Sequence, residues 1–198
     1  YTYSETTSTT TQWSAGTSWS ATPVSAADTI LAFTGDLASG INVVSNNDFA
    51  GNFLLNRLNF TYNATAATPT VTISGNPLEF TGASATLNFS PPGTVNMSLT
   101  ISNDLVLSSS LTVSTGTSSS APTRIARLDG TISGSGSLTF NWGAGAPAMF
   151  VLSNQSNSYA GDTRLTHSST TSRTYILRLG ASEVIPHGTG KGNVFFST

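Results

Sequence analysis

The sequence of 198 residues contains no cysteine and only one lysine, Lys191. Without cysteine the chain can form no disulfide bond and can offer no thiolate ligand to a metal ion. Charged residues make up 8% of the chain, against about 25% in an ordinary soluble domain, so Ser, Thr and Asn must supply most of the polar surface. Hydrophobic residues still make up 37%, which excludes the low-hydrophobicity, high-charge composition of a disordered chain.

The sequence also lacks long hydrophobic runs. No stretch approaches the roughly 20 apolar residues of a membrane-spanning helix, and no signal peptide is visible. The first residue is Tyr1 rather than Met. We therefore expect a secreted chain whose signal peptide has been removed, or a chain cut from a longer one, and an extracellular or cell-surface location. The net charge of −2 argues against nucleic acid as a partner.

The few charges are unevenly distributed. Residues 1–120 carry one basic and six acidic residues, a net charge of −5, whereas residues 121–198 carry six basic and three acidic residues, a net charge of +3. On an elongated fold this distribution gives an acidic end and a basic end. Chance and a functional dipole explain the asymmetry equally well at this point.

Short alternations of apolar and polar residues, separated by Gly, Asn and Ser, are the main pattern of the sequence. They are clearest at residues 131–140, 149–152 and 175–179. The alternation predicts half-buried β-strands, and the separating residues predict tight turns. The connections are too short for crossover helices, so consecutive strands either pair as hairpins or stack as coils of a solenoid. Residues 111–113 continue the strand pattern, and residues 108–122, rich in Ser and Thr, are predicted to contain a loop that leaves the stack.

Three motifs follow one another in the second half of the chain: ISGSGSLT at 132–139, VLSNQSNSYAGDTRL at 151–165 and LRLGASEVIPHGTGKGNV at 177–194. Together they resemble the autotransporter-associated β-strand repeat of bacterial surface proteins. The resemblance implies an all-β fold, a right-handed parallel β-helix that is secreted or displayed on a cell surface. Such repeats are usually parts of scaffolds and adhesins, so we expect a structural or adhesive protein without catalytic activity or a cofactor.

Several residues within these motifs have predicted structural roles. We expect Asn157 to tolerate a left-handed backbone, Tyr159 to pack inward and Gly161 to take a positive φ. Other glycines could be mistaken for phosphate-binding loops, but none opens a helix, so they are predicted turn residues. These turn glycines are Gly134, Gly136, Gly188 and Gly190.

The N-terminal segment divides into two parts. Residues 1–12, which include Tyr1 and Tyr3, are rich in Ser and Thr and predict an arm that is either flexible or able to add a strand to a neighbouring molecule. Residues 13–198 are predicted to form one solenoid domain. Trp13 and Trp19 are six residues apart, so on a strand they would share one face, and we expect them to cover the first coil.

The length of one coil is less clear from the sequence. Phe60 and Phe80 end two similar apolar segments, and their offset of 20 residues falls within the range of one solenoid coil. Coils in this half of the chain are inferred from the density of predicted strands, because no clean period is present.

Candidate catalytic and metal-binding residues are few. Carbohydrate-cleaving β-helices use clustered carboxylates, and the nearest candidates here are Asp162, Arg164 and His167, with Asp129 as a second acid on an adjacent coil. An isolated carboxylate favours a structural role, but a carbohydrate-binding or carbohydrate-cleaving β-helix stays open as an alternative. His167 and His187 lack the spacing of metal ligands and no calcium-binding loop is present, so we predict no metal site.

The last residues, 192–198, read as an apolar strand that contains Phe195 and Phe196 and is followed by no polar cap. We expect this basic C-terminal end to stack on the acidic N-terminal end of the next copy, giving a head-to-tail filament. An equally supported interpretation is a segment of a larger autotransporter-like adhesin whose next coil is absent. The predicted partners are therefore a second copy of the chain and a surface polysaccharide.

Overall fold

The computed structural model describes residues 1–65, 68–92, 96–116, 124–143, 148–168 and 174–197. Within these ranges the chain is all-β, and its parallel strands stack into a solenoid of about six turns. The predicted parallel β-solenoid with an N-terminal capping segment is confirmed. The hairpin alternative is wrong, because every pairing between the named strands is parallel.

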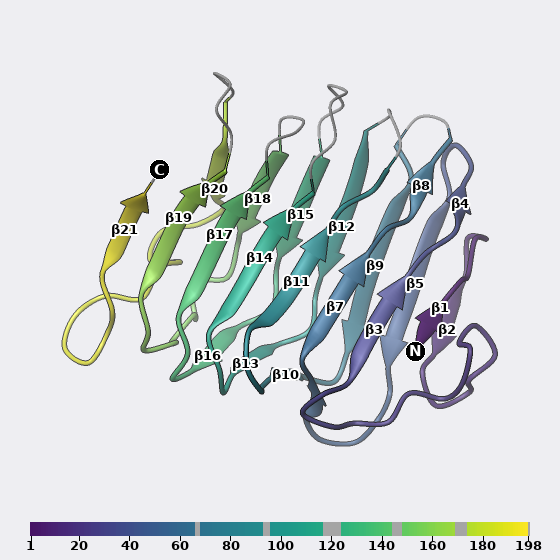
Figure 1. Ribbon diagram of the computed structural model, residues 1–198, viewed down its shortest axis with the longest axis horizontal. Coiled ribbons are helices and arrows are strands. Elements are labelled where there is room, and N and C mark those ends of the chain that lie inside the picture. The colour runs from purple at the N-terminus through teal and green to yellow at the C-terminus, as the bar shows by residue number, and fades with distance from the viewer. Residues whose placement is uncertain (66–67, 93–95, 117–123, 144–147, 169–173, 198) are drawn as a thin grey trace.

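Three sheets run along the solenoid axis, which lies horizontally in Figure 1 with the N-terminal coil on the right and the C-terminal coil on the left. The eight-stranded sheet contains, in axial order, β1 (Thr2–Tyr3), β3 (Ile30–Phe33), β7 (Arg57–Phe60), β11 (Ala85–Phe89), β14 (Leu111–Thr115), β17 (Leu138–Trp142), β19 (Thr163–His167) and β21 (Val194–Ser197). The seven-stranded sheet contains β2 (Thr10–Gln12), β5 (Asn42–Asn47), β9 (Thr70–Gly75), β12 (Met97–Ile101), β15 (Arg124–Leu128), β18 (Ala148–Leu152) and β20 (Ile176–Leu179). The four-stranded sheet contains β6 (Phe53–Leu55), β10 (Leu78–Phe80), β13 (Leu105–Leu107) and β16 (Ile132–Gly134), and a separate pair is formed by β4 (Asp36–Leu37) and β8 (Asn63–Ala64).

The alternation of residue types places each strand between the core and the solvent. In β14, Leu111 and Val113 are buried while Thr112 and Ser114 are partly exposed, because successive side chains of a strand point to opposite faces. This strand includes the predicted strand at residues 111–113, and residues 117–122 of the range predicted to contain a loop lie outside the described residues. Inward rows then continue from coil to coil; one consists of Leu31, Leu58, Leu87, Val113, Phe140, Leu165 and Phe196.

One coil is longer than the offset of 20 residues between Phe60 and Phe80 suggests. Phe60 pairs in register with Phe89, which is 29 residues away, whereas Phe80 lies in the four-stranded sheet and pairs with Leu55. The two phenylalanines therefore belong to different sheets. The error arose because one coil contributes two to four strands, so similar apolar segments recur more often than the coils themselves.

Buried asparagines tie successive coils together. Asn103 donates its side-chain N–H to the backbone oxygen of Asn76 at 2.8 Å. Asn157 accepts a hydrogen bond from the backbone N–H of Ile132 and donates to the backbone oxygen of Val184, both at 2.8 Å. Asn157 does not have a positive φ, so the predicted left-handed role is wrong and bridging between coils replaces it.

Glycines at one corner of the solenoid are required by close backbone contact. A Cβ atom on Gly161 would lie 2.5 Å from the backbone of Gly136, and a Cβ atom on Gly192 would lie 2.4 Å from the backbone of Gly161. Gly136 and Gly161 do not have positive φ, so the predicted positive φ of Gly161 is wrong. Glycine occupies these positions because only a residue without a side chain allows the backbones of adjacent coils to approach this closely.

The other predicted turn glycines do take left-handed conformations. Gly134 has a φ of 102°, Gly188 of 94° and Gly190 of 75°. Gly134 also packs against the preceding coil, because a Cβ atom there would lie 2.5 Å from the backbone oxygen of Leu107. Gly188 and Gly190 have open space around them, so the turn geometry alone explains these two residues.

The predicted N-terminal arm is part of the solenoid. Within residues 1–12, β1 pairs with β3 and β2 pairs with β5, both in parallel. The chain thus uses these residues as its own first coil, in contrast to the expected free or strand-donating arm. Their Thr and Tyr side chains suit a strand, and β3 and β5 supply the partner edges that an isolated arm would lack.

Candidate functional site: the two ends of the solenoid

The candidate catalytic residues do not form a catalytic group. Asp162 precedes β19 and His167 ends it, which puts them roughly 16 Å apart along an extended strand. The Asp162 carboxylate accepts hydrogen bonds from the backbone N–H of Asn193 at 3.0 Å and from Arg164 at 2.6 Å. These contacts hold the pKa of Asp162 below its usual value, with the Asn193 hydrogen bond as the largest cause. A carboxylate that stays ionised in this way is suited to structure rather than to proton transfer.

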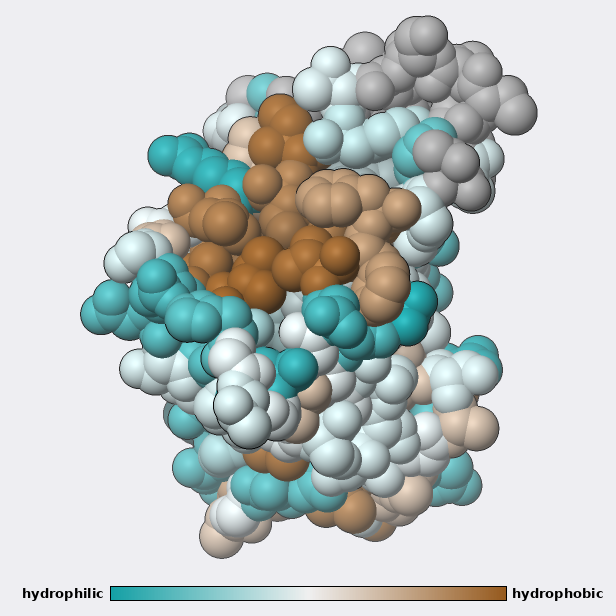
Figure 2. Space-filling view, turned by 90° about the vertical axis from the view of Figure 1, so that its left-hand side faces the viewer, coloured by the Kyte–Doolittle hydropathy of each residue, from teal (hydrophilic) through white to brown (hydrophobic). Residues whose placement is uncertain are grey.

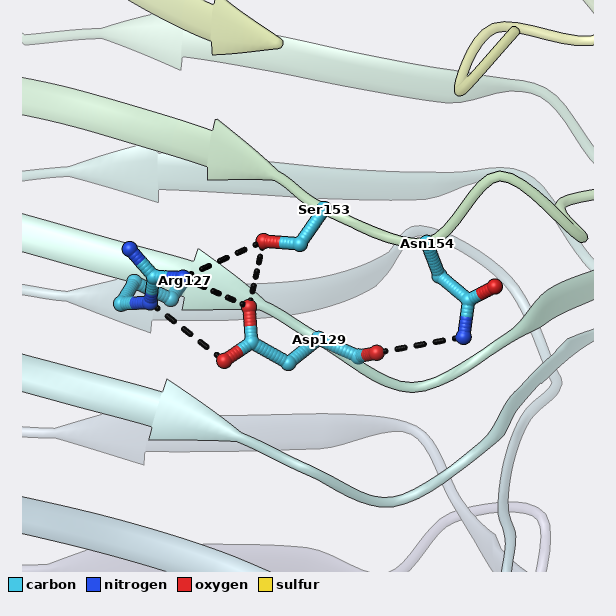
Figure 3. Close-up of polar contacts among 4 residues, drawn as sticks. All are labelled: Arg127, Asp129, Ser153 and Asn154. Carbon is cyan, nitrogen blue, oxygen red and sulfur yellow. Dashed lines mark hydrogen bonds and ion pairs between the residues drawn. The ribbon is translucent and has the colours of Figure 1, made fainter. Parts of the chain in front are cut away.

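The second predicted acid, Asp129, belongs to a different cluster, which Figure 3 shows at the end of β15. Its carboxylate accepts hydrogen bonds from Ser153 at 2.5 Å and from Arg127 at 3.3 Å, and its backbone oxygen accepts one from Asn154 at 3.3 Å. Arg127 and Asp129 lie on one coil and Ser153 and Asn154 on the next, so the cluster joins two coils. Asp129 and Asp162 share no hydrogen-bond partner, and the predicted carboxylate pair is not assembled.

The remaining polar candidates have local partners. His187 contacts the carboxylate of Glu183, and the ammonium group of Lys191 donates to the backbone oxygen of Ser158. Among the described residues, no three His, Cys, Asp or Glu side chains gather as potential metal ligands. Because the polar candidates form no common cluster, we examine the two ends of the solenoid as the candidate functional surfaces.

The N-terminal end is closed by an aromatic lid, by which we mean Tyr3, Trp13 and Trp19. Tyr3 and Trp13 are fully buried and Trp19 nearly so. The Trp13 and Trp19 rings meet edge to face with centroids 5.5 Å apart, and the Trp13 indole N–H donates to Ser45 at 2.8 Å. Edge-to-face packing of this kind adds to the stabilisation from burial alone.

The two tryptophans reach the lid by a different route from the one the sequence suggests. Trp13 follows β2 directly, whereas Trp19 lies after a turn and pairs with Tyr3 in an isolated antiparallel bridge. They are thus on two segments that meet, and not on one face of one strand. The turn between them contains Gly16, whose φ is 69° and which no uninterrupted strand would accommodate.

The chain also covers the backbone edges at this end. Along β1, the backbone N–H groups of Ser4 and Ser20 donate to the oxygens of Ser18 and Thr2 at 3.0 and 2.8 Å. Along β6, Ala26 donates to Leu54 at 3.1 Å. Two of the three sheets therefore end at the N-terminal side on a strand whose outer edge is occupied by the chain itself, which prevents further strand pairing there.

The C-terminal end has no such cover in the part of the chain that the structure describes. Figure 2 looks onto this end and shows one continuous hydrophobic patch across it. Phe196 is 80% exposed although it continues an inward row of core residues, and Leu179 is 50% exposed. β20 and β21 each pair with one strand only. The patch is a cross-section of the core, and we call it the C-terminal face.

The C-terminal face contains a hollow of about 320 Å³ at the corner between the eight-stranded and seven-stranded sheets. The rings of Trp142, His167, Tyr175 and Phe196 line it together with Leu165. The His167 and Tyr175 rings stack with centroids 5.3 Å apart. His167 thus takes part in aromatic packing, and no carboxylate of the described residues contacts it, which separates it from the predicted group with Asp162.

Large hydrophobic side chains are exposed only near the two ends of the described chain. The large hydrophobic residues that are exposed are Tyr1, Val24 and Ile30 near the N-terminus and Ile176, Leu179, Val194, Phe195 and Phe196 in the last coil. Phe195 faces outward, and the Arg164 guanidinium lies 4.6 Å from the centre of its ring.

Searches against protein-family models, curated proteins and solved structures found no match to this chain. The resemblance to the autotransporter-associated repeat therefore rests on the three motifs in the sequence and stays a prediction. The described residues contain no helix long and apolar enough to span a membrane.

Sequence reasoning identified the aromatic residues of both ends but missed two features. It missed the covering of β1 by residues 18–20, because an antiparallel bridge between Tyr3 and Trp19 leaves no local pattern. It also missed the contribution of Tyr175 and Trp142 to the C-terminal face. The available signal was that both lie next to turn-rich segments, at ends of predicted strands.

Proposed function

We propose that this chain is an extracellular structural or adhesive solenoid that self-associates through its ends. One observation carries the proposal: the exposed large apolar side chains of the described residues are confined to the first and last coils. A rod with a sparsely charged, hydroxyl-rich flank and an apolar end favours contacts between ends over contacts between flanks. The autotransporter-like motifs support a location at the cell surface.

The fold supports a mechanical role through its repetition. Hydrogen bonds between parallel strands run along the axis, so each added coil stiffens the rod, and bridging side chains such as Asn103 and Asn157 join coils at the corners. A scaffold needs this kind of regular shape and a hydroxyl-rich flank. It needs no catalytic centre, and we retain the prediction that the chain is not an enzyme.

Labelling of intact source cells tests the extracellular location. Antibodies raised against the purified chain are expected to bind cells without permeabilisation, and the folded chain is expected to resist a protease that digests it after thermal unfolding. Labelling that requires permeabilisation would contradict the proposal. Association is measured separately by negative-stain electron microscopy and light scattering in low and high salt, where a flank-to-flank aggregate would contradict the role of the ends.

Polysaccharide binding is a second candidate function, favoured by one observation. An open hollow of about 640 Å³ beside β11 and β14 is lined by hydroxyl groups, including those of Ser84, Ser109 and Thr112. Hydroxyl groups can exchange hydrogen bonds with sugars, although no aromatic ring lines this hollow for stacking. Cosedimentation with polysaccharide should decrease for Ser109→Arg and stay unchanged for the control Ala15→Arg, which adds the same charge on the N-terminal turn.

A depolymerisation assay with the same polysaccharides tests for enzymatic activity. No product is expected from the wild-type chain. Activity that is lost in Asp162→Ala would overturn both the structural assignment of Asp162 and the prediction that the chain is not an enzyme.

A further inference from the structure

We infer that the hollow beside β11 and β14 binds a short stretch of an uncharged polysaccharide that lies parallel to the solenoid axis. The inference rests on the polysaccharide binding proposed above as the second candidate function, and it specifies the class of sugar chain, its direction and the groups that hold it. The residues that line the hollow lie between positions 82 and 136, so neither end of the chain contributes to it.

Three turns of successive coils form the hollow at one corner of the solenoid. Residues 81–84 connect β10 to β11, residues 108–110 connect β13 to β14, and residues 135–137 connect β16 to β17. Neighbouring parallel strands lie about 4.8 Å apart, so the three turns span about 10 Å along the axis. The volume of about 640 Å³ is typical of ligand sites, which range from about 300 to 1,000 Å³. A ligand that contacts all three turns therefore has to extend along the axis.

The hollow presents hydroxyl groups that the protein itself leaves free. Seven of its nine lining residues are Ser or Thr and the other two are glycines, so hydroxyls are its main polar side-chain groups. Within the described chain, four of these hydroxyl groups make no hydrogen bond: those of Ser84, Ser109, Thr112 and Ser135. Each can donate one hydrogen bond and accept others, as sugar hydroxyls do. The three turns thus offer matching partners to successive units of a sugar chain.

Thr86 adds a hydroxyl group that lacks a partner. Thr86 lines the hollow, and its buried Oγ1 atom makes no hydrogen bond among the described residues. Buried polar groups in folded proteins are nearly always hydrogen-bonded. A water molecule held between Thr86 and a bound sugar would supply this partner, since bridging waters are common in polar binding sites.

Ser84 occupies a position whose backbone conformation favours glycine. Its φ is 55°, in the left-handed region that residues with a side chain rarely adopt. Glycine there would relieve the strain but would remove one of the free hydroxyl groups. Strained residues of this kind cluster at binding sites, which agrees with a role for this hydroxyl group in the hollow.

The surroundings of the hollow favour an uncharged sugar chain over an acidic one. Hydrogen bonds from Asn52 at 3.0 Å and from Ser108 at 2.7 Å lower the pKa of Glu79, so its carboxylate stays ionised next to a lining residue. Among the residues described, no basic side chain lines the hollow. A sulfated or uronic acid polysaccharide would meet a negative charge here and gain no ion pair.

A peptide fits this site less well than a sugar chain. Extended peptides bind by adding a strand to a free sheet edge, but β11 and β14 are each paired on both sides. The described lining also contains no large apolar side chain against which a peptide side chain could pack.

Native affinity electrophoresis tests the ligand class. The gels contain one of four soluble neutral polysaccharides (dextran, mannan, arabinoxylan or mixed-linkage β-glucan) or the acidic polymer polygalacturonate. We expect at least one neutral polymer to retard the wild-type chain and polygalacturonate to leave its migration unchanged. Retardation by polygalacturonate alone, or by none of the polymers, would overturn the inference.

Hydroxyl-deleting variants test the site with little change in shape. The double variant Thr86→Val, Thr112→Val should raise the dissociation constant for the retarding polymer about tenfold, because two hydrogen-bonding groups are lost. The matched control Thr72→Val removes an outward threonine hydroxyl from β9, outside the hollow, and should leave binding unchanged. Ser84→Gly removes a free hydroxyl group while relieving backbone strain, so it should fold at least as well as the wild type and bind more weakly.

Oligosaccharides of defined length, prepared from the polymer that binds, test the direction of the sugar chain. Their ability to release the protein from the polymer should increase with length until the oligosaccharide spans the three turns, and should then level off. A monosaccharide that competes as well as the longer chains would overturn the extended orientation.

The outcomes separate this inference from the proposed functions. Polysaccharide binding that neither the double variant nor Ser84→Gly weakens would overturn this site while supporting polysaccharide binding elsewhere on the chain. Absence of binding to all neutral polymers would overturn the inference together with the second candidate function. Association through the ends would still be decided by microscopy and light scattering, because the hollow lies on the flank.

Discussion

Both ends of the solenoid contain aromatic residues, but these are buried at the N-terminal end and largely exposed at the C-terminal end. At the N-terminal end, Tyr3, Trp13 and Trp19 are buried against one another; at the C-terminal end, Phe196 is 80% exposed and Leu179 is 50% exposed. Composition does not explain the difference, since both ends are rich in aromatic residues. The difference is that residues 13–26 fold back over the first coil, whereas the last coil has no covering segment among the described residues.

This comparison shows that a solenoid buries its apolar side chains in one way within the stack and in another way at its ends. Within the stack, each coil buries the apolar rows of its neighbours, so alternation along the strand is enough. At an end there is no next coil, and a segment of irregular backbone has to cover both the side chains and the strand edge. At the N-terminal end, one segment covers the aromatic side chains and the outer edges of β1 and β6, whereas no described segment covers the C-terminal face.

Replacing one aromatic residue at each end is the strongest test of the difference in burial between the two ends. Trp13→Ala should lower the free energy of unfolding by about 3–5 kcal/mol, because it opens a cavity in the lid and leaves Ser45 without its indole partner. Phe196→Ala should change it by less than about 1 kcal/mol in the monomer, because that side chain is mostly in water already. Urea unfolding followed by circular dichroism measures both. Equal losses would show that the two ends are covered to the same extent.

A glycine substitution sharpens the comparison by testing whether the coils beside the bare face are tightly stacked. Gly161→Ala should lower the free energy of unfolding by about 3 kcal/mol, because its Cβ atom would lie 2.5 Å from the backbone of Gly136. The control Gly188→Ala has open space and should cost only about 1 kcal/mol for its left-handed φ of 94°. Thermal unfolding of the two variants measures both changes in stability. Similar losses of unfolding free energy would mean that the C-terminal coils are loosely packed.

The smallest expected effect concerns acid and the N-terminal lid. Hydrogen bonds from Thr7, and further ones from Thr6 and Ser18, lower the pKa of Glu5 from its usual 4.5. A carboxyl group with a lowered folded-state pKa stabilises the fold above about pH 4.5, and this contribution is lost as the pH falls through the folded-state pKa. Amide hydrogen exchange, corrected for intrinsic rates, should show protection in residues 1–20 decreasing below that pH.

Glu5→Gln provides the control for this acid effect. It should remove most of the pH dependence in residues 1–20, because the amide does not titrate, while Asp162→Asn should leave the N-terminal exchange unaltered. Protection in residues 1–20 that falls equally in wild type and Glu5→Gln would assign the effect to another group, such as Asp48, which binds Ser14 across the lid and whose pKa is also lowered.

Much of the fold could be predicted from the sequence because it depends on local patterns. The alternation of residues 137–140 predicts a strand with alternating inward and outward side chains; the structure has β17 there, with Leu138 and Phe140 buried and Thr139 partly exposed. Tyr159 is buried, in agreement with its predicted inward position. Gly161 and Asn157 have structural roles, but the predicted left-handed conformations are wrong, because both residues are required by contacts with the neighbouring coil and not by their own turn.

The candidate site could be predicted only in part. The aromatic residues of the last coil were visible in the sequence. The separation of Asp129 from Asp162 was not visible, because it depends on which corner of the coil each acid occupies. The length of a coil was equally hidden, since strands of different sheets look alike in sequence.

The sequence by itself determined that the chain alternates inward apolar and outward hydroxyl-bearing residues, because the two faces of a strand impose a period of two on whatever sheet it joins. Only the tertiary structure decided which end of the stack is covered. That outcome depends on contacts between residues far apart in the chain, such as Thr2 with Ser20 and Ala26 with Leu54, for which no local pattern selects the partner.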